Sequence, residues 1–382
     1  MRKRASIVLM ALLIVLLTIS GCRPTKPKGE VIVYVCAPLS GWQADGGQTV
    51  VGGVNLMAER INESGGLLGY TVKVIAIDDE ADDDVAAEVA QQIAQEMVRS
   101  DRRIIGIIGH YNSGQTLVAM ETYADLPVIV ITTTASDVSL TQKGYRNFFR
   151  VNASDAAQGP VDARFLVEEL GSKRIVLVNA DNGYGRGLRD QMIAALGDLG
   201  TEPVAVLEIT EAADTHASVI PKIAAAQPDA IFLAGYETEG YVLLPEIREA
   251  GIEATFMASD GCFLYEFIDG SGLVAEGAYV SGITPDPHAF TDDKWWKEYQ
   301  VLETRNPGTY SVAGYAAMQV LSEGVKTAGT FDTSRIADAI RSLITATTVG
   351  DVAYQDNGDL AEQNIYIFRV ENQDFVQVQP EP

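Results

Sequence analysis

The sequence predicts an α/β protein with two lobes, each built on a parallel β-sheet, and a hinge where the chain crosses between them. One observation is an alternation of strands and amphipathic helices that runs from residue 30 almost to the end of the chain. Another is that the strands are continuous apolar runs, which is typical of parallel sheets covered by helices on both faces. The third is the length of 382 residues, which is enough for two domains.

The first series of elements begins with residues 30–38, a run rich in β-branched residues that fits a buried strand. Val50, Val54, Met57 and Ile61 then recur at spacings of 4, 3 and 4, as one face of a helix requires. The same patterns predict strands at 72–77, 104–108 and 128–131, and helices at 85–98 and after Ser113.

The second series repeats this alternation. It predicts helices at 161–170, 188–199, 216–226 and 240–250, and strands at 175–178, 204–209, 230–233 and 255–258. Because Pro245 lies inside the last of these helices, we expect that helix to start late or to kink there.

The C-terminal third predicts mostly helices, followed by short strands. The helices are expected at 294–304, 312–327 and 333–343, and the strands at 352–354, 365–370 and 375–378. About ten strands would strain a single twisted sheet, so two sheets are expected. We assign residues 30–150 and 285–351 to an N-terminal lobe, and residues 151–284 and 352–382 to a C-terminal lobe. The crossings near Arg150, Thr284 and Asp351 would form the hinge.

The first 21 residues predict an export signal. Basic residues at positions 2–4 precede an apolar run that is too short to span a bilayer, as in a signal peptide. The residues before Cys22 resemble the lipobox of bacterial lipoproteins, in which the cysteine becomes the lipid-modified N-terminus. The alternative is a plain secretory signal with an incidental cysteine. If Cys22 carries lipid, residues 22–29 read as a polar tether to the membrane, and the protein is expected outside the cytoplasm.

Charge and composition exclude several functions. The chain has 28 Lys+Arg against 52 Asp+Glu, a net charge of −24, so phosphate backbones would repel it and no nucleic-acid partner is expected. Cys22, Cys36 and Cys262 have no CxxC spacing and the three histidines are far apart, so we expect neither a metal site nor a disulfide framework. Residues 183–187 depart from the dinucleotide-binding pattern, and the chain has no GxSxG motif. We therefore expect no cofactor and no enzymatic activity.

Polar residues gather after the predicted strands, where ligands bind in open α/β sheets. Ser113 opens a helix, whose free N–H groups suit a carboxylate. The other strand ends supply hydroxyls at 132–137, residues 181–187 with Tyr184, then Tyr236 with Glu239, and Asp260. Taken one at a time, each serine or threonine is most simply interpreted as a helix cap. Taken together, the hydroxyls, aromatic rings and acids at these strand ends indicate a binding site for a small zwitterionic ligand.

These residues also carry a family resemblance. The chain closely resembles the leucine/isoleucine/valine-binding protein family, the type I solute-binding proteins of branched-chain amino acid ABC transporters. The resemblance rests on an ordered set of motifs: Leu39-Ser40-Gly41, Gly52-Gly53-Val54, Ile61-Asn62, Gly65-Gly66, Ile77-Asp78-Asp79, Ile108-Gly109-His110, Ser139-Leu140-Thr141, Gly144-Tyr145-Arg146-Asn147, Phe149-Arg150, Gln158-Gly159-Pro160, Tyr184-Gly185, Gly235-Tyr236, Ala250-Gly251, Gly314-Tyr315-Ala316-Ala317 and Gly358-Asp359-Leu360. It extends from about residue 30 to 378 and implies the type I periplasmic-binding-protein fold, with two Rossmann-like lobes that close on a ligand.

The resemblance also implies roles for the polar residues. Ser113 and Ser136 would hold the α-carboxylate of an amino acid, and Thr134 with Ala135 would offer backbone groups to it. Asp260 stands where the family often has Glu and would pair with the α-ammonium.

The remaining candidates would surround the ligand. Tyr184 and Tyr236 would close from the second lobe, and Trp42, Tyr111 and Tyr310 could line the side-chain pocket. Glu239 could be a second anion for the ammonium, could contact a polar ligand side chain, or could be a solvated acid at a helix start.

Gly46 and Gly47 stand where relatives can have a bulky aromatic residue, so a wider pocket is expected. The family's disulfide positions read Ala81 and Asn112 here, so that bridge is absent.

The sequence thus predicts an extracytoplasmic lipoprotein that captures an amino acid, branched-chain or otherwise apolar, and passes it to an ABC permease. One alternative on the same fold is a binder of urea, short amides or aromatic acids. Another is a ligand-sensing ectodomain that acts with a signalling partner.

Overall fold

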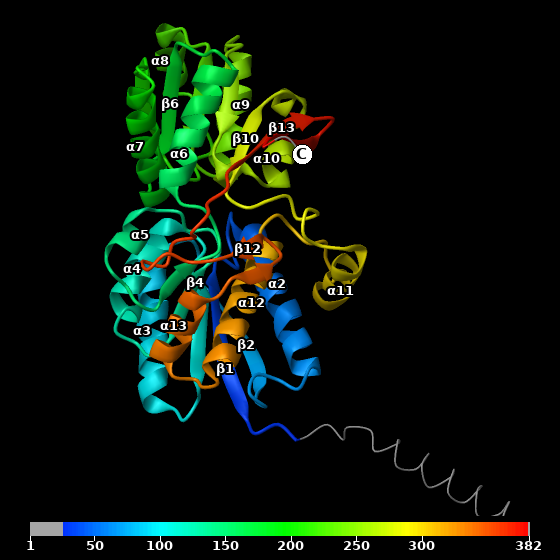
Figure 1. Cartoon of the computed structure of the whole chain (residues 1–382). Coiled ribbons are helices and arrows are strands. Elements are labelled where there is room, and N and C mark those ends of the chain that lie inside the picture. Colours follow the sequence, from blue (N-terminus) through cyan, green and yellow to red (C-terminus); the bar gives the residue numbers. More distant parts are fainter. Residues whose placement is uncertain (1–25, 381–382) are drawn as a thin grey trace, which may run out of the picture.

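Two lobes, each built on its own sheet, lie end to end in the computed structural model, which describes residues 26–380 (Figure 1). The first sheet is wholly parallel, with the strand order β2-β1-β3-β4-β5. Its strands are β1 (Glu30–Ala37), β2 (Thr71–Asp78), β3 (Ile104–Gly109), β4 (Ile129–Thr132) and β5 (Phe148–Arg150). The predicted α/β class with parallel sheets is confirmed.

Helices cover both faces of the first sheet. The alternating side chains of β1 show why this strand is apolar throughout: Val33 faces the core under α2 and α12, whereas Tyr34 faces the core under α3 and α4. The helices of this lobe are α2 (Ala44–Glu63), α3 (Asp83–Arg99), α4 (Ser113–Tyr123), α5 (Ser139–Gln142), α11 (Asp293–Glu303), α12 (Ser311–Ala328) and α13 (Thr333–Ser342). A small hairpin, β11 (Thr345–Thr347) with β12 (Gly350–Val352), lies beside α12.

The second sheet has the strand order β14-β13-β10-β9-β8-β6-β7. Its parallel strands are β6 (Ile175–Ala180), β7 (Ala205–Ile209), β8 (Ala230–Ala234), β9 (Thr255–Ala258) and β10 (Tyr279–Gly282), and the antiparallel edge is β13 (Tyr366–Glu371) and β14 (Asp374–Gln379). The helices are α6 (Asp155–Arg164), extended by a π-helical turn at Phe165–Glu169, then α7 (Gly183–Asp198), α8 (Ile220–Ala226), α9 (Glu237–Glu249) and α10 (Tyr265–Ser271). Short 3₁₀ turns lie at Asp260–Cys262 and Gly272–Ala275.

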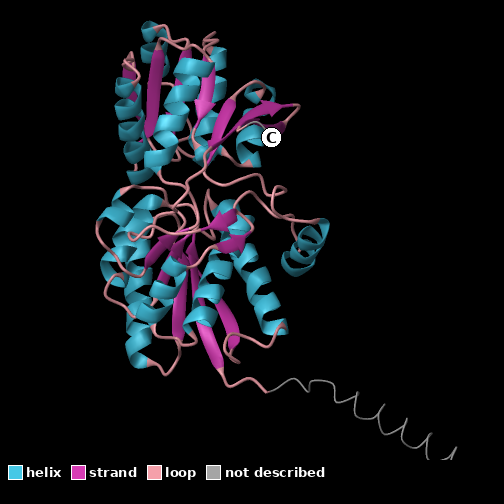
Figure 2. Cartoon of the chain, viewed as in Figure 1, coloured by secondary structure: helices cyan, strands magenta, loops and turns pink. Residues whose placement is uncertain are grey.

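The chain passes between the lobes after β5, after β10 and before β13 (Figures 1 and 2). At the first crossing Arg150 is fully buried, and its guanidinium binds Asp359 at 2.7 Å and the carbonyls of Ala135 and Asp137. Val352 and Leu360 belong to the core of the first lobe. These contacts favour a last crossing after Leu360, later than the predicted one near Asp351. The full division of residues between lobes stays a prediction.

Some elements differ from those that the sequence predicts. α9 begins at Glu237, before the expected start at residue 240, and Pro245 lies within it, so the expected late start is wrong. Glu239 explains the difference, because its carboxylate accepts the N–H of Tyr236 and fixes an earlier helix start. α5, β5, α10, β10 and β11 were not predicted. β5 and β10 have only three and four residues, too few for their periodicity to stand out.

No helix within residues 26–380 is long and apolar enough to cross a membrane. The predicted signal peptide and Cys22 lie outside the described residues. Cys36 and Cys262 are buried, and neither forms a disulfide within the part of the chain that the structure describes.

Candidate ligand-binding site

A cavity lies between the lobes at the carboxyl ends of both sheets. The space between its walls is about 290 Å³ including open solvent, and it is lined by Tyr111, Asn112, Ser113, Thr134, Tyr184, Tyr236, Asp260, Gly261 and Tyr310. The first four of these residues follow β3 and β4 of the first lobe. In the second lobe, Tyr184 follows β6, Tyr236 follows β8 and Asp260 follows β9. Tyr310 precedes α12. The structure therefore brings most of the predicted residues together, at the sheet edge where open α/β folds bind ligands. Their contacts with a ligand stay a prediction.

One end of the cavity presents hydrogen-bond donors. Ser113 is the first residue of α4, and its Oγ accepts the backbone N–H groups of Ser136 and Asp137 at 3.2 Å each. Since those two bonds occupy its lone pairs, the hydroxyl hydrogen of Ser113 is available to an acceptor. No side chain within residues 26–380 caps α4, so the N–H groups of its first turn also face this end. Such a helix start suits a carboxylate.

Of the residues after β4, Thr134 lines this end, whereas Ser136 is fully buried and does not line the cavity. The Oγ of Ser136 has no hydrogen-bond partner in the described chain. None of the hydrogen bonds within residues 26–380 uses the backbone N–H or carbonyl of Thr134, whose Oγ1 donates to the carbonyl of Tyr111. Thr134 can thus offer both a backbone donor and a backbone acceptor to a ligand.

Asp260 provides the opposite charge at the cavity and is 4% exposed. Tyr184 Oη donates to Asp260 Oδ1 at 2.5 Å, and Tyr310 Oη donates to the Asp260 carbonyl at 2.7 Å. Burial raises the pKa of Asp260 to about 6, because a desolvated carboxylate is disfavoured. An ammonium beside it would compensate for the lost hydration and restore the charged form.

Aromatic rings form much of the remaining wall. The rings of Tyr184 and Tyr236 stack with their centroids 5.0 Å apart. The ring centroid of Trp42, in the first lobe, lies 5.6 Å from that of Tyr236. Tyr111 and Tyr310 meet edge to face at 5.7 Å. Trp42 does not itself line the cavity but packs against Tyr236, which does.

The wider pocket expected at Gly46 and Gly47 is not formed. A Cβ on Gly46 would lie 2.6 Å from Tyr111 Oη, so Tyr111 already fills that space. A Cβ on Gly47 would lie 1.8 Å from the carbonyl oxygen of Pro38. Gly47 thus permits the close approach of α2 to the end of β1, rather than enlarging the cavity.

Ala135 and Glu239, like Trp42 and Ser136, do not line the cavity. The N–H of Ala135 donates to Thr132 Oγ1, and its carbonyl accepts from Arg150 and Asn152, so its backbone groups are already in use. Glu239 is fully buried, and its two carboxylate oxygens accept the N–H groups of Tyr236 and Ala212 at 2.8 and 2.7 Å. Burial raises the pKa of Glu239 to about 7. Its role is to cap α9 and hold Tyr236 in place, so both assignments are corrected.

Sequence reasoning missed Asn112, Gly261 and Gln43. Asn112 and Gly261 line the cavity beside the predicted Ser113 and Asp260, so inspecting the neighbours of each candidate could have found them. Asn112 Nδ2 donates to Gln43 Oε1 at 2.6 Å, which ties the cavity wall to the start of α2. Nothing in the local sequence indicates that this pair forms.

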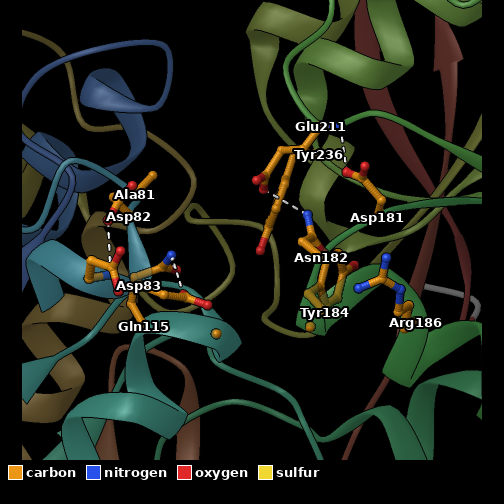
Figure 3. A pocket seen from close by; sticks show the side chains of 13 residues that line it. Ala81, Asp82, Asp83, Gln115, Asp181, Asn182, Tyr184, Arg186, Glu211 and Tyr236 are labelled. Carbon is orange, nitrogen blue, oxygen red and sulfur yellow. Dashed lines mark hydrogen bonds between the residues drawn. The ribbon is translucent and has the colours of Figure 1, made fainter. Parts of the chain in front are cut away.

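A second, acidic cavity opens between the lobes and shares Tyr184 and Tyr236 with the first (Figure 3). One wall is the start of α3, with Asp82 and Asp83, and the other carries Asp181 and Glu211. Burial raises the pKa of Glu211, and Asp181, Asp83 and Asp82 add to the rise. The space, about 800 Å³ including open solvent, forms an acidic approach to the binding cavity.

Comparisons with known proteins agree with this architecture. The model of the periplasmic binding protein family matches residues 33–374. An amino acid binding protein of Pseudomonas aeruginosa is 27% identical, with 90% of this chain and 91% of that protein covered. A leucine-, isoleucine-, valine-, threonine- and alanine-binding protein of the same organism is 27% identical, with 88% of each chain covered.

Solved structures show the same fold. A leucine-binding protein of Thermotoga maritima superposes with a TM-score of 0.82 at 24% identity, covering 91% of this chain and 97% of that one. A solute-binding protein of R. palustris in complex with benzoate gives 0.81 at 18% identity, covering 92% and 96%. The family match spans nearly the whole described chain, and we conclude that this protein belongs to the periplasmic binding protein family.

Proposed function

We propose that this protein captures an amino acid between its two lobes, outside the cytoplasm, and delivers it to the permease of an ABC transporter. The observation that carries the proposal is that hydrogen-bond donors and a buried acid line the same cavity. The Ser113 hydroxyl and the start of α4 supply donors, and Asp260 supplies a buried acid. This arrangement matches the α-carboxylate and α-ammonium that every amino acid carries.

Closure provides the mechanism. A ligand that touches residues of both lobes binds the closed state more tightly than the open one, so binding shifts the population toward closure. The permease would recognise the closed pair of lobes, and no covalent bond changes. Closure would also remove water from around the ligand, which would strengthen the contacts to its carboxylate and ammonium. Curated relatives whose names include amino acid binding support this proposal.

Calorimetry on two groups of variants tests the site. Asp260→Ala removes the proposed partner of the ammonium, and the double variant Ser113→Ala, Ser136→Ala removes the two hydroxyls that the family resemblance assigns to the carboxylate. Each is expected to weaken amino acid binding at least tenfold. Glu249→Gln, which changes an exposed acid at the last position of α9, is the control. Unchanged affinity in both test variants would remove the proposed site.

A binder of aromatic acids is the second candidate, because Tyr184, Tyr236, Tyr111 and Tyr310 enclose the cavity and a structural neighbour is described in complex with benzoate. Benzoate has a carboxylate but no ammonium, so it would leave Asp260 unpaired. A thermal-shift panel of amino acids, benzoate, urea and short amides separates these ligands. A larger shift with benzoate than with any amino acid would favour the second candidate.

The lipid anchor and the cellular role are also proposals. We propose that Cys22 is the lipid-modified N-terminus, and mass spectrometry of the membrane-bound protein tests it through a diacylglycerol adduct that Cys22→Ser should lose. A sensory role with a signalling partner is the alternative to transport. Stimulation of ATP hydrolysis by the reconstituted permease in the presence of the loaded protein would support transport.

A further inference from the structure

A shallow hollow lies at the end of the first lobe that is opposite the binding cavity. Its walls include Lys28, Tyr70, Arg103 and Phe331, and the space between them is about 780 Å³ including open solvent. Lys28, Tyr70 and Arg103 precede the parallel strands β1, β2 and β3. Because the carboxyl ends of these strands lie at the binding cavity, their starts lie at the opposite edge of the sheet. We call this feature the basal hollow.

Aromatic rings, and not acids, hold the two cations of the basal hollow. The Arg103 guanidinium lies 4.9 Å from the ring centroid of Tyr70 and 5.0 Å from that of Phe331. Lys28 Nζ donates to the carbonyl of Leu68 at 2.9 Å and lies 5.9 Å from the Tyr70 centroid. No ion pair formed by residues 26–380 includes Lys28 or Arg103, and both side chains are exposed. Both cations therefore keep N–H donors for an external anion.

The charge of the basal hollow is opposite to that of the whole chain. The chain has 52 Asp+Glu against 28 Lys+Arg, yet none of the described residues that line the basal hollow is acidic. Glu30, Asp101 and Asp332, which neighbour the lining residues in the sequence, are exposed and do not line it. Asp332 instead accepts the N–H of Arg335 and caps α13. Charge complementarity thus favours an anionic partner at this surface.

The chain enters the fold at this surface. Figure 1 shows that β1 starts at the end of the first lobe farthest from the second lobe. Lys28 follows Cys22 by six residues, a distance of about 21 Å at full extension. Lipid on Cys22 would therefore hold the basal hollow close to the bilayer surface, where headgroups are the anions present at high local concentration.

We propose that the basal hollow binds anionic phospholipid headgroups and holds the base of the first lobe against the membrane. This inference rests on the proposed lipid anchor and does not depend on which ligand the cavity binds. The Arg103 guanidinium and the Lys28 ammonium suit phosphate oxygens, and aromatic rings such as those of Tyr70 and Phe331 are typical of membrane–water interfaces. The cavity lies at the other end of the first lobe, so the second lobe would close without meeting the membrane.

Resonance energy transfer in vesicles tests the proposal with the lipid-anchored protein. A donor dye is placed on Thr327→Cys, an exposed position near the end of α12, and the acceptor is a headgroup-labelled lipid. The native Cys36 and Cys262 are buried and stay unlabelled. Vesicles of phosphatidylcholine are compared with vesicles that also contain about 30% phosphatidylglycerol. The anionic lipid is expected to raise the transfer efficiency at least twofold at low salt, and about 0.5 M salt should abolish the rise because it screens the charges.

Paired variants assign the effect to the basal hollow. Lys28→Gln with Arg103→Gln should lose the rise. Lys173→Gln with Lys222→Gln removes two exposed cations of the second lobe and should retain it. Equal transfer from both kinds of vesicle in the parent overturns the inference, and a rise that survives in the first pair overturns its assignment to this surface. A protein without lipid on Cys22 overturns the inference together with the proposed anchor, whereas calorimetry with amino acids tests the binding cavity separately.

Discussion

The phenol of Tyr310 donates a hydrogen bond to the backbone carbonyl of Asp260 at 2.7 Å and so joins the two lobes at the binding cavity. Tyr310 belongs to the core of the first lobe, whereas Asp260 follows β9 of the second. Tyr184 of the second lobe holds the Asp260 side chain at the same time. The acid proposed for the ligand ammonium is therefore held from both lobes, which couples its position to closure.

Tyr310→Phe is expected to weaken ligand binding by about fivefold. The change keeps the ring but leaves the Asp260 carbonyl without its partner in the closed state, a loss of about 1 kcal/mol. Isothermal titration calorimetry measures the effect. Tyr315→Phe is the control, because its hydroxyl accepts from Arg60 between helices of the first lobe and should leave affinity unchanged. Equal affinities of Tyr310→Phe and the parent would show that this bond does not stabilise closure.

Glu239→Ala is expected to lower the free energy of unfolding by about 1–2 kcal/mol. The substitution frees the N–H groups of Tyr236 and Ala212 and removes the cap of α9. Urea unfolding measures it, with Glu249→Ala, an exposed residue at the last position of the same helix, as the control. Equal stability of the two variants would contradict the capping role.

The ligand-free protein is expected to lose stability as pH rises from 5 to 7.5. Burial raises the pKa of Asp155 and Glu239 to about 7 and that of Asp260 to about 6. The folded state therefore holds more protons than the unfolded state in this range, and the free energy of unfolding falls as those protons are released. Thermal melts across this range check the slope. A melting temperature that rises toward pH 7.5 would contradict the account.

Amino acid binding is expected to release protons near pH 6. An ammonium beside Asp260 favours its carboxylate and lowers a pKa that stands at about 6 in the ligand-free protein. Titrations at pH 6 in buffers of different ionisation enthalpy count the protons, and the release should diminish at pH 8. Asp260→Asn should abolish this release, whereas Glu249→Gln, which changes an exposed acid, should retain it.

The sequence was sufficient to predict the fold class because the alternation of apolar strands and amphipathic helices is strong and local. Strand ends also indicated most cavity residues, since the carboxyl ends of parallel strands meet at one edge. Tyr310 came from the family resemblance, and the structure places it beside Tyr111. The fold class thus follows from local sequence patterns, and the grouping of the strand-end residues follows from the topology of the sheets.

Contacts between residues far apart in the sequence could not be predicted from local patterns. Glu239 looked like a candidate ligand contact, but its carboxylate is used by backbone N–H groups, one of them from Ala212, 27 residues away. Ala135 was misassigned because its carbonyl is bound by Arg150, a contact that exists only after β5 docks beside β4.

The most direct test of the central claim has two steps. Calorimetry first measures the affinity of each amino acid, and it then measures the affinity of an analogue of the tightest-binding amino acid that lacks only the α-ammonium group. The account predicts that at least one amino acid binds and that the analogue binds at least 100-fold more weakly, because it would leave Asp260 unpaired. An analogue that binds as tightly as the amino acid itself would contradict the claim that the cavity recognises both ends of a zwitterion.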